Sequence, residues 1–405
     1  MHSLQDLENG ALAGARHVRL THLGLTTFPR QLFDLADTLE VLDLSGNQLT
    51  ALPDDFARFS KLRIVFASNN PFTQLPSVLG QCPQLEMVGF KACRIAHVPE
   101  DSLPAKLRWL ILTDNQLTQL PASLGQRPRL QKLMLSCNQL SALPDLRAGS
   151  RLELLRIASN QFTQIPATLL QLPGLAWPAL AGNPITYKSE LLTLNTQGLE
   201  AYFAHDIDRH ELLGEGASGH IYRATHRPTG QALALKVFKA AATSDGTPQS
   251  ELAAGLAAGQ HPHLLTPLAR LEGGIDGRLA MALPLLPAGY VNLAGPPSFA
   301  SCTRDVYDDA IRFTPETAQR LLACVRSALQ HLHARGVLHG DLYAHNILYK
   351  PETGEAILSD LGAALLLHDL PPSQAEQLMA IEWRAFAHLQ AEVQARTLPS
   401  AVAQA

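Results

Sequence analysis

Long apolar runs are missing from this sequence of 405 residues, and no stretch of bilayer-spanning length occurs in it. A membrane-spanning helix is therefore not expected. The segment from Met1 to Gly14 contains acidic residues and lacks the apolar centre of a signal peptide. An excess of one charge is missing too, because the net charge is only −4. We therefore expect neither nucleic acid nor an anionic membrane as a partner.

Cysteine is scarce as well. The thiols are odd in number and show no repeated spacing: Cys82, Cys93, Cys137, Cys302 and Cys324. This favours buried thiols in a reducing compartment over a disulfide framework. Two His-x-His pairs, His261/His263 and His331/His333, are the main metal candidates. Neither pair has a cysteine or another histidine pair at the sequence spacing that zinc sites require. The sequence thus favours a cytoplasmic globular protein.

A repeated pattern organises the first half of the chain. Its apolar residues recur as L-x-x-L-x-L-x-x-N-x-L-x-x-L-P. A degenerate copy begins near Ala15, and further copies begin at Leu39, Leu62, Leu85, Leu107, Leu130, Leu152 and Leu175. The x-L-x-L-x part predicts a short strand, the asparagine a turn, and the proline the start of a return segment. The pattern resembles the intracellular class of leucine-rich repeats, which implies an α/β solenoid over residues 15–187.

One column of strand positions is expected on the concave face of such a solenoid. It contains the apolar residues Val41, Ile64, Met87, Trp109, Leu154 and Trp177, with Lys132 at one position. Exposed tryptophans and aliphatic side chains are typical of a protein-binding surface. We therefore expect this column to bind a protein, which could be another chain or the second half of this one.

Residues 188–206 interrupt the repeat, and apolar residues such as Leu191, Leu192 and Tyr202 fit the inner face of an irregular helical cap over the last coil. No linker rich in glycine, serine or proline follows the cap. A third region, residues 207–405, carries different motifs.

The first of these motifs is Gly214-x-Gly216-x-x-Gly219, which predicts a glycine hairpin whose backbone amides can approach phosphates. Four more motifs follow in order. They are Lys236 in a strand-like stretch, Glu251 in a helix-like stretch, Asp341 and Asn346 in HGDLYAHNIL, and Asp360 in SDLGAA.

In this order the motifs resemble the protein-kinase superfamily. The resemblance implies an α+β bilobal domain that binds ATP with Mg²⁺ or Mn²⁺. It implies that Asp341 accepts the proton of the substrate hydroxyl, and that Lys236, paired with Glu251, holds the α- and β-phosphates. The implied metal ligands are Asn346 and Asp360. The implied ATP site comprises Leu213, Gly214, Glu215, Gly216, Gly219, Ile221, Ala234 and Lys236.

Several features depart from the kinase pattern. Gly340 stands where kinases have the arginine of His-Arg-Asp, so switching by a phosphorylated activation segment is not expected. Tyr343 stands where Ser/Thr kinases have a lysine, a loss that His345 or Arg384 could offset. Ala-Pro-Glu is missing, Glu382 replaces an aspartate of the core helix, and we expect a reduced C-lobe.

An additional segment, residues 288–312, is longer than a kinase hinge. It could cover the adenine site or contact the repeats.

We therefore predict a protein kinase, with Ser/Thr specificity, whose repeats recruit its protein substrate. Two alternatives stay open at this point. The absent lysine and docking segment would also fit a nucleotide-binding pseudokinase scaffold. The His-Gly-Asp loop also resembles that of aminoglycoside and choline kinases, which phosphorylate small molecules.

Overall fold

The structure of the protein is a computed structural model, which describes all residues except 1, 149–150, 197–199, 217, 241 and 400–405. The chain divides into two compact units, Met1–Leu175 and Ala176–Ala405. None of the helices in the described part of the chain is long and apolar enough to cross a membrane.

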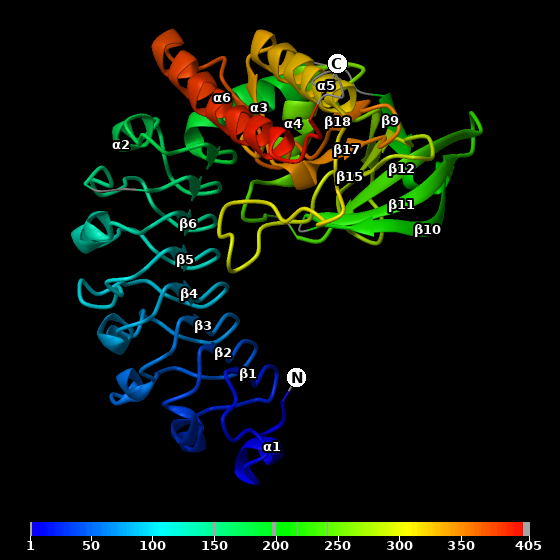
Figure 1. The fold of residues 1–405 in the computed structure, drawn as a ribbon. Coiled ribbons are helices and arrows are strands. Elements are labelled where there is room, and N and C mark those ends of the chain that lie inside the picture. Colours follow the sequence, from blue (N-terminus) through cyan, green and yellow to red (C-terminus); the bar gives the residue numbers. More distant parts are fainter. Residues whose placement is uncertain (1, 149–150, 197–199, 217, 241, 400–405) are drawn as a thin grey trace, which may run out of the picture. The chain divides into compact units, whose positions relative to one another are not determined.

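The first unit is a solenoid of short parallel strands (Figure 1). After helix α1 (Leu4–Glu8), its strands are β1 (His17–Arg19), β2 (Val41–Asp43), β3 (Ile64–Phe66), β4 (Met87–Gly89), β5 (Trp109–Ile111), β6 (Lys132–Met134) and β7 (Leu154–Arg156). Each strand pairs in parallel with the next, so equivalent residues of successive copies stand side by side. The central leucine or valine of each strand is buried. This periodic burial confirms the predicted repeat solenoid.

Short helical turns form the return segments. Three of them are 3₁₀ helices that follow a proline, at Arg30–Leu35, Ser77–Gln81 and Ala122–Gln126. Helix α2 (Ala167–Leu170) follows Pro166 in the same way. Proline favours these starts because its φ is fixed and it lacks the N–H that the first turn of a helix leaves unpaired.

The repeated asparagines connect neighbouring copies through buried hydrogen bonds. Asn138 is representative: its Nδ2 donates to the carbonyls of Leu112 and Leu135, both at 2.9 Å, and its Oδ1 accepts from Leu117 N at 3.0 Å. Cys93 occupies the asparagine slot in one copy, where its Sγ donates to Ala67 O at 3.5 Å. Each side chain thus satisfies backbone groups that burial would otherwise leave unpaired.

The second unit begins with β8 (Trp177–Ala179) and helix α3 (Pro184–Thr196). A sheet in the order β10-β11-β12-β14-β13-β9 follows, formed by β9 (Glu200–Phe203), β10 (Ile207–Glu215), β11 (Gly219–His226), β12 (Gln231–Phe238), β13 (Ala269–Glu272) and β14 (Ala280–Pro284). Helix α4 (Pro248–Ala258) lies between β12 and β13 in sequence. This sheet with its helix forms one lobe.

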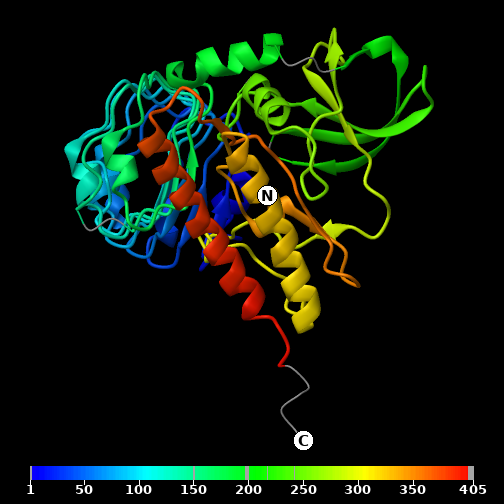
Figure 2. The ribbon, with the colours of Figure 1, turned by 90° about the horizontal axis from the view of Figure 1, so that it is seen from above.

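The other lobe contains two long helices, α5 (Pro315–Ala334) and α6 (Pro372–Gln394), which lie side by side (Figure 2). Four short strands follow α5: β16 (Val337–Leu338), β17 (Ile347–Tyr349), β18 (Ala356–Leu358) and β19 (Leu365–Leu366). Strand β15 (Val291–Asn292), in the segment before α5, pairs with β17. A sheet lobe and a helical lobe agree with the predicted bilobal domain.

The predicted helical cap, residues 188–206, is correct only in part. Helix α3 ends at Thr196, and residues 200–203 form β9, which pairs in parallel with β13. Tyr202 is the one buried residue of this strand, and it packs into the sheet core. In α3 the prediction of an apolar inner face is wrong, since Leu191 and Leu192 are exposed and Ser189 and Glu190 are buried.

The domain boundaries at residues 187 and 206 stay a prediction, although the second compact unit already begins at Ala176.

We expect Asn138→Ala to destabilise the repeat unit by about 1–3 kcal/mol, because it leaves buried backbone groups without partners. The apparent melting temperature of the full chain measures the effect. Gln139→Ala is a matched control, since Gln139 is the exposed neighbour. Equal melting temperatures for the two variants would contradict the proposed role of the asparagine.

Candidate active site

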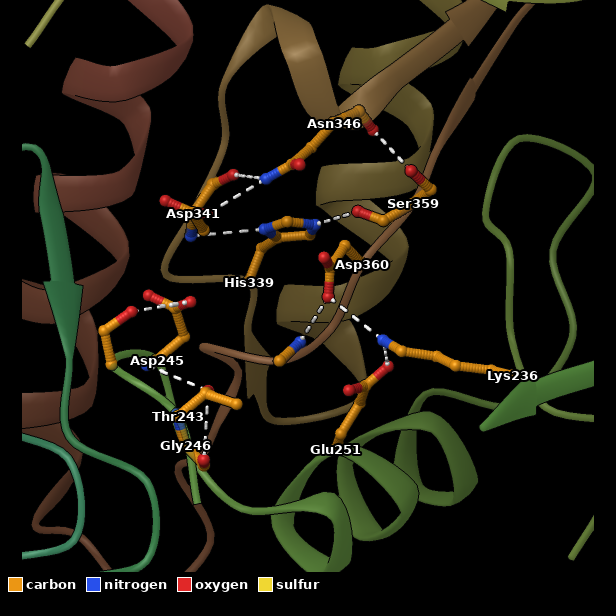
Figure 3. Close-up of polar contacts among 12 residues, drawn as sticks. Lys236, Thr243, Asp245, Gly246, Glu251, His339, Asp341, Asn346, Ser359 and Asp360 are labelled. Atoms are coloured by element: carbon orange, nitrogen blue, oxygen red, sulfur yellow. Dashed lines mark hydrogen bonds and ion pairs between the residues drawn. The ribbon is translucent and has the colours of Figure 1, made fainter. Parts of the chain in front are cut away.

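Three charged side chains from separate elements meet in the second unit (Figure 3). Lys236 extends from β12, and its Nζ lies 2.5 Å from Glu251 Oε1 of α4 and 3.5 Å from Asp360 Oδ1. Lys236 and Glu251 are buried, whereas the Asp360 side chain is 44% exposed. The lysine therefore connects the sheet, helix α4 and the segment after β18.

Burial and charge act in opposite directions on these groups. Burial alone would lower the pKa of Lys236, but the neighbouring Asp360 and Glu251 carboxylates raise it to about 12. Burial raises the pKa of Glu251, and Lys236 opposes this. Partial burial also opposes ionisation of Asp360, but Lys236 outweighs it and the pKa of that carboxyl is lowered. The arrangement keeps a cation and an exposed anion next to each other.

Residues 339–346, here called the HGD loop, are held by a second set of contacts. His339 is fully buried; its Nδ1 accepts from Asp341 N at 3.2 Å, and its Nε2 lies 3.0 Å from Ser359 O. Asn346 Nδ2 donates to both the backbone oxygen and Oδ2 of Asp341, each at 2.9 Å. Ser359 Oγ donates to Asn346 O at 2.9 Å. These contacts fix the Asp341 carboxylate beside the segment that carries Asp360.

The glycine motif forms the turn between β10 and β11, as predicted. Space for a Cβ is open at Gly214 and Gly216, whereas at Gly219 a Cβ would lie 2.7 Å from Val237 O. Glu215, predicted to line the ATP site, is paired with Lys239 at 2.6 Å. Of the other predicted lining residues, Ala234 is buried, Ile221 is half-buried and Leu213 is exposed.

A magnesium ion fits the chemistry of Asn346 and Asp360. The Nδ2 of Asn346 is used by Asp341, so no described residue donates to its Oδ1, and Asp360 carries a partly exposed carboxylate. Mg²⁺ in phosphate sites takes one or two protein oxygens and completes its shell with water and phosphate. Among the described residues no cluster of three or more His, Cys, Asp or Glu side chains could hold a metal by itself.

The backbone conformation and the surroundings of Gly340 explain why this position carries a glycine. Its φ is +76°, and a Cβ at this position would lie 2.5 Å from Ala363 O and 2.8 Å from Pro178 O. Its N–H donates to Glu382 Oε1 at 2.6 Å, while Glu382 Oε2 lies 2.7 Å from His333 Nε2. The buried Glu382 carboxylate thus holds the HGD loop at Gly340, the position where kinases have an arginine. The backbone oxygens of Ala363 and Pro178 occupy the space that a side chain at this position would need.

The additional segment, residues 288–312, contacts the HGD loop. Asp305, whose side chain is fully buried, accepts from His345 N at 2.9 Å and lies 2.8 Å from His345 Nδ1. Burial lowers the pKa of His345, but Asp305 outweighs this and the pKa is raised. Sequence reasoning proposed His345 as a substitute cation but missed Asp305, because nothing in the sequence relates two residues 40 positions apart.

From Val41 to Leu154 the predicted concave column lies in register, but the side chains of the column differ in exposure. Val41 is half-buried, whereas Ile64, Met87, Trp109, Leu154 and Trp177 are buried, so the expected exposure is seen only at Val41. Trp177 contacts the second half of this chain, which is one of the two occupants that the sequence left open. This residue belongs to the second unit, and its indole Nε1 donates to Leu342 O of the HGD loop at 2.9 Å. For the others, protein binding stays a prediction.

Comparison with known proteins supports both halves of this architecture. Residues 207–393 match the protein kinase domain, and residues 38–59 match a leucine-rich repeat. The chain therefore combines leucine-rich repeats with a protein kinase domain.

Relatives of the kinase domain are distant. Cyclin-dependent kinase B2-1 of Arabidopsis thaliana is 26% identical over 174 residues, which cover 42% of this chain and 53% of that protein. The DNA damage-responsive serine/threonine-protein kinase RqkA of Deinococcus radiodurans is 30% identical over 161 residues, covering 38% of this chain and 22% of that protein. The chain thus spans about half the length of the first relative and about a fifth of the second.

Among solved structures, an internalin (inlF) of Listeria monocytogenes is 19% identical, with 47% of this chain and 54% of that chain covered and a TM-score of 0.39. This score is too low to assign a fold, and the repeat fold rests on the strand register described above.

We expect Gly340→Ala to destabilise the second unit by about 1–3 kcal/mol, because the methyl group would be forced against two backbone oxygens. Thermal unfolding of the full chain measures this. Gly230→Ala is a matched control, with φ +70° but open space around its Cβ position. If Gly340→Ala costs no more than the control, then backbone crowding is not the reason for the glycine.

The raised pKa of His345 predicts pH-dependent stability. A histidine whose pKa is higher in the folded chain contributes stability that is fully present below its unfolded value, about 6.5, and is lost as pH rises through the folded value. The melting temperature of His345→Gln should therefore fall below that of the unmodified protein by a few degrees more at pH 6 than at pH 9.

His205→Gln serves as the control for this experiment, since the His205 side chain is 78% exposed. A deficit of His345→Gln that is equal at both pH values would show that its pairing with Asp305 does not depend on charge.

Proposed function

We propose that the protein is an ATP- and Mg²⁺-dependent kinase that transfers the γ-phosphate to Ser or Thr of a protein recruited by its repeats. The observation that carries this proposal is the meeting of Lys236, Glu251 and Asp360 beside the Asp341–Asn346 pair. Phosphoryl transfer requires positioning and neutralised charge more than covalent chemistry by the protein. This set of side chains supplies both.

In the proposed reaction each residue has a separate task. Lys236, held in place by Glu251, neutralises the α- and β-phosphates. The Asp341 carboxylate, oriented by Asn346 Nδ2, accepts the proton of the attacking hydroxyl. Mg²⁺, held by Asn346 Oδ1 and Asp360, would neutralise charge on the phosphates.

Ser/Thr specificity, protein recruitment and cytoplasmic location belong to the same proposal. The relatives named above support kinase activity of the serine/threonine type, and the aligned strands of the repeats support a recruitment surface. Cys82, Cys93 and Cys324 carry free thiols, which supports a reducing compartment, and burial raises the pKa of Cys82 to about 12.

We expect purified protein to transfer label from [γ-³²P]ATP to itself or to a basic protein substrate with Mg²⁺ or Mn²⁺. Asp341→Asn should lower the rate roughly 10²-fold or more, because the proton acceptor is lost. Asp309→Asn, at an exposed aspartate of the same unit, should leave the rate unchanged. Lys236→Met should abolish the increase in melting temperature caused by ATP, whereas Asp341→Asn should keep it.

Two results would overturn the proposal in different ways. ATP binding without label transfer by the unmodified protein would identify a nucleotide-binding scaffold. Label on an aminoglycoside or choline, with none on protein, would identify a small-molecule kinase.

A further inference from the structure

Trp177 is buried against the HGD loop, with 2% of its surface exposed. Its Nε1 donates to Leu342 O at 2.9 Å, and its ring stacks on Tyr343, with ring centroids 4.3 Å apart and planes inclined by 11°. On α6 the ring of His388 lies 5.4 Å away, and the Arg304 guanidinium lies 5.0 Å from the indole. The indole thus fills a site formed by the HGD loop, α6 and residues 288–312.

The residues that Trp177 contacts directly follow Asp341 in the chain. Tyr343 N donates to Asp341 O at 2.8 Å, so the backbone turns tightly at this point. The Leu342 carbonyl and the Tyr343 ring are therefore joined to Asp341 through one tight backbone turn.

A second contact joins the same strand to the loop. Pro178, the next residue of β8, places its carbonyl oxygen 2.8 Å from the position of a Cβ on Gly340, which precedes Asp341. Strand β8 therefore lies against the HGD loop on both sides of Asp341.

We propose that Trp177 is a positioning residue for the Asp341 carboxylate, acting through the Leu342 carbonyl and the Tyr343 ring. The expected effect of Trp177 on the reaction rate rests on the proposed kinase function, whereas its expected effect on the conformation of the HGD loop does not. Leu342 is almost fully buried, so its carbonyl depends on the indole N–H as a donor. Tyr343 stands where Ser/Thr kinases have a lysine, and in this chain the position carries a stacked ring in place of a cation.

The proposal predicts a separation of kinetic constants. Lys236 and Glu251, which hold the nucleotide in the proposed function, stand on β12 and α4, whereas the contacts of Trp177 described here lie on the HGD loop, α6 and residues 288–312. Trp177→Phe keeps a ring for stacking but removes the N–H donor. Because small displacements of a reacting group cost up to about 10² in rate, we expect kcat to fall about tenfold or more. The KM for ATP should change less than about twofold.

The experiment compares full-length Trp177→Phe with Trp383→Phe, at a tryptophan of α6 that packs on Phe386. Rates are divided by the fraction of molecules that bind ATP, so unfolded protein does not contribute. Hydrogen exchange of peptides covering residues 339–346 is measured by mass spectrometry in the same samples, with peptides of β12 as internal reference. We expect exchange in the HGD loop to accelerate in Trp177→Phe and not in Trp383→Phe.

The outcomes separate this proposal from the kinase function. If the unmodified protein transfers no phosphate but Trp177→Phe accelerates exchange in the loop, the kinase function fails and the positioning role stands. If exchange in the loop is unchanged by Trp177→Phe, the positioning role is wrong, whatever the activity. Equal proportional losses of kcat in both variants would also overturn it, because they would indicate a general packing effect.

Discussion

The buried ion pair between Lys236 and Glu251 is the interaction on which the second unit depends. Two charges removed from water persist only together, because loss of either partner leaves the other uncompensated. The pair therefore requires α4 to stay against the sheet. Ser250, beside Glu251, donates to Glu190 of α3 at 2.9 Å, and Glu190 also accepts from Gly182 N. Helix α3, polar on its buried face, in this way supports the position of Glu251.

The fold was predictable where a local pattern repeats. The spacing of leucine and asparagine predicted the solenoid, since every copy repeats the same core positions and the same asparagine hydrogen bonds to its neighbour. The five kinase motifs predicted the second domain, because five separate motifs rarely occur in one order by chance. The positions of Lys236, Glu251, Asn346 and Asp360 relative to Asp341 agree with that prediction, although their roles in transfer stay proposals.

The remaining features depend on contacts between segments that are distant in sequence. Trp177 occupies a strand position that the repeat pattern assigns to a concave surface, and only the fold shows that Leu342 and Tyr343 lie against it. The contact of Asp305 with His345 could not be predicted, because a single aspartate in a long segment belongs to no repeated pattern. In α3 the sequence pattern predicted burial where the structure shows exposure. Leu191 and Leu192 are exposed, because the face of this helix that packs against the rest of the unit is polar.

Strand β8 belongs to two parts of the chain at once, and this limits which repeat copies can be replaced or lost in evolution. By sequence β8 belongs to the last repeat copy, and by its contacts it belongs to the unit that carries the HGD loop. Gain or loss of whole copies upstream of Leu175 leaves Trp177 and Pro178 in place, so a change in the number of copies does not by itself alter the residues that contact the HGD loop. The final copy is not interchangeable with the others, because any replacement must also fit the backbone of Gly340.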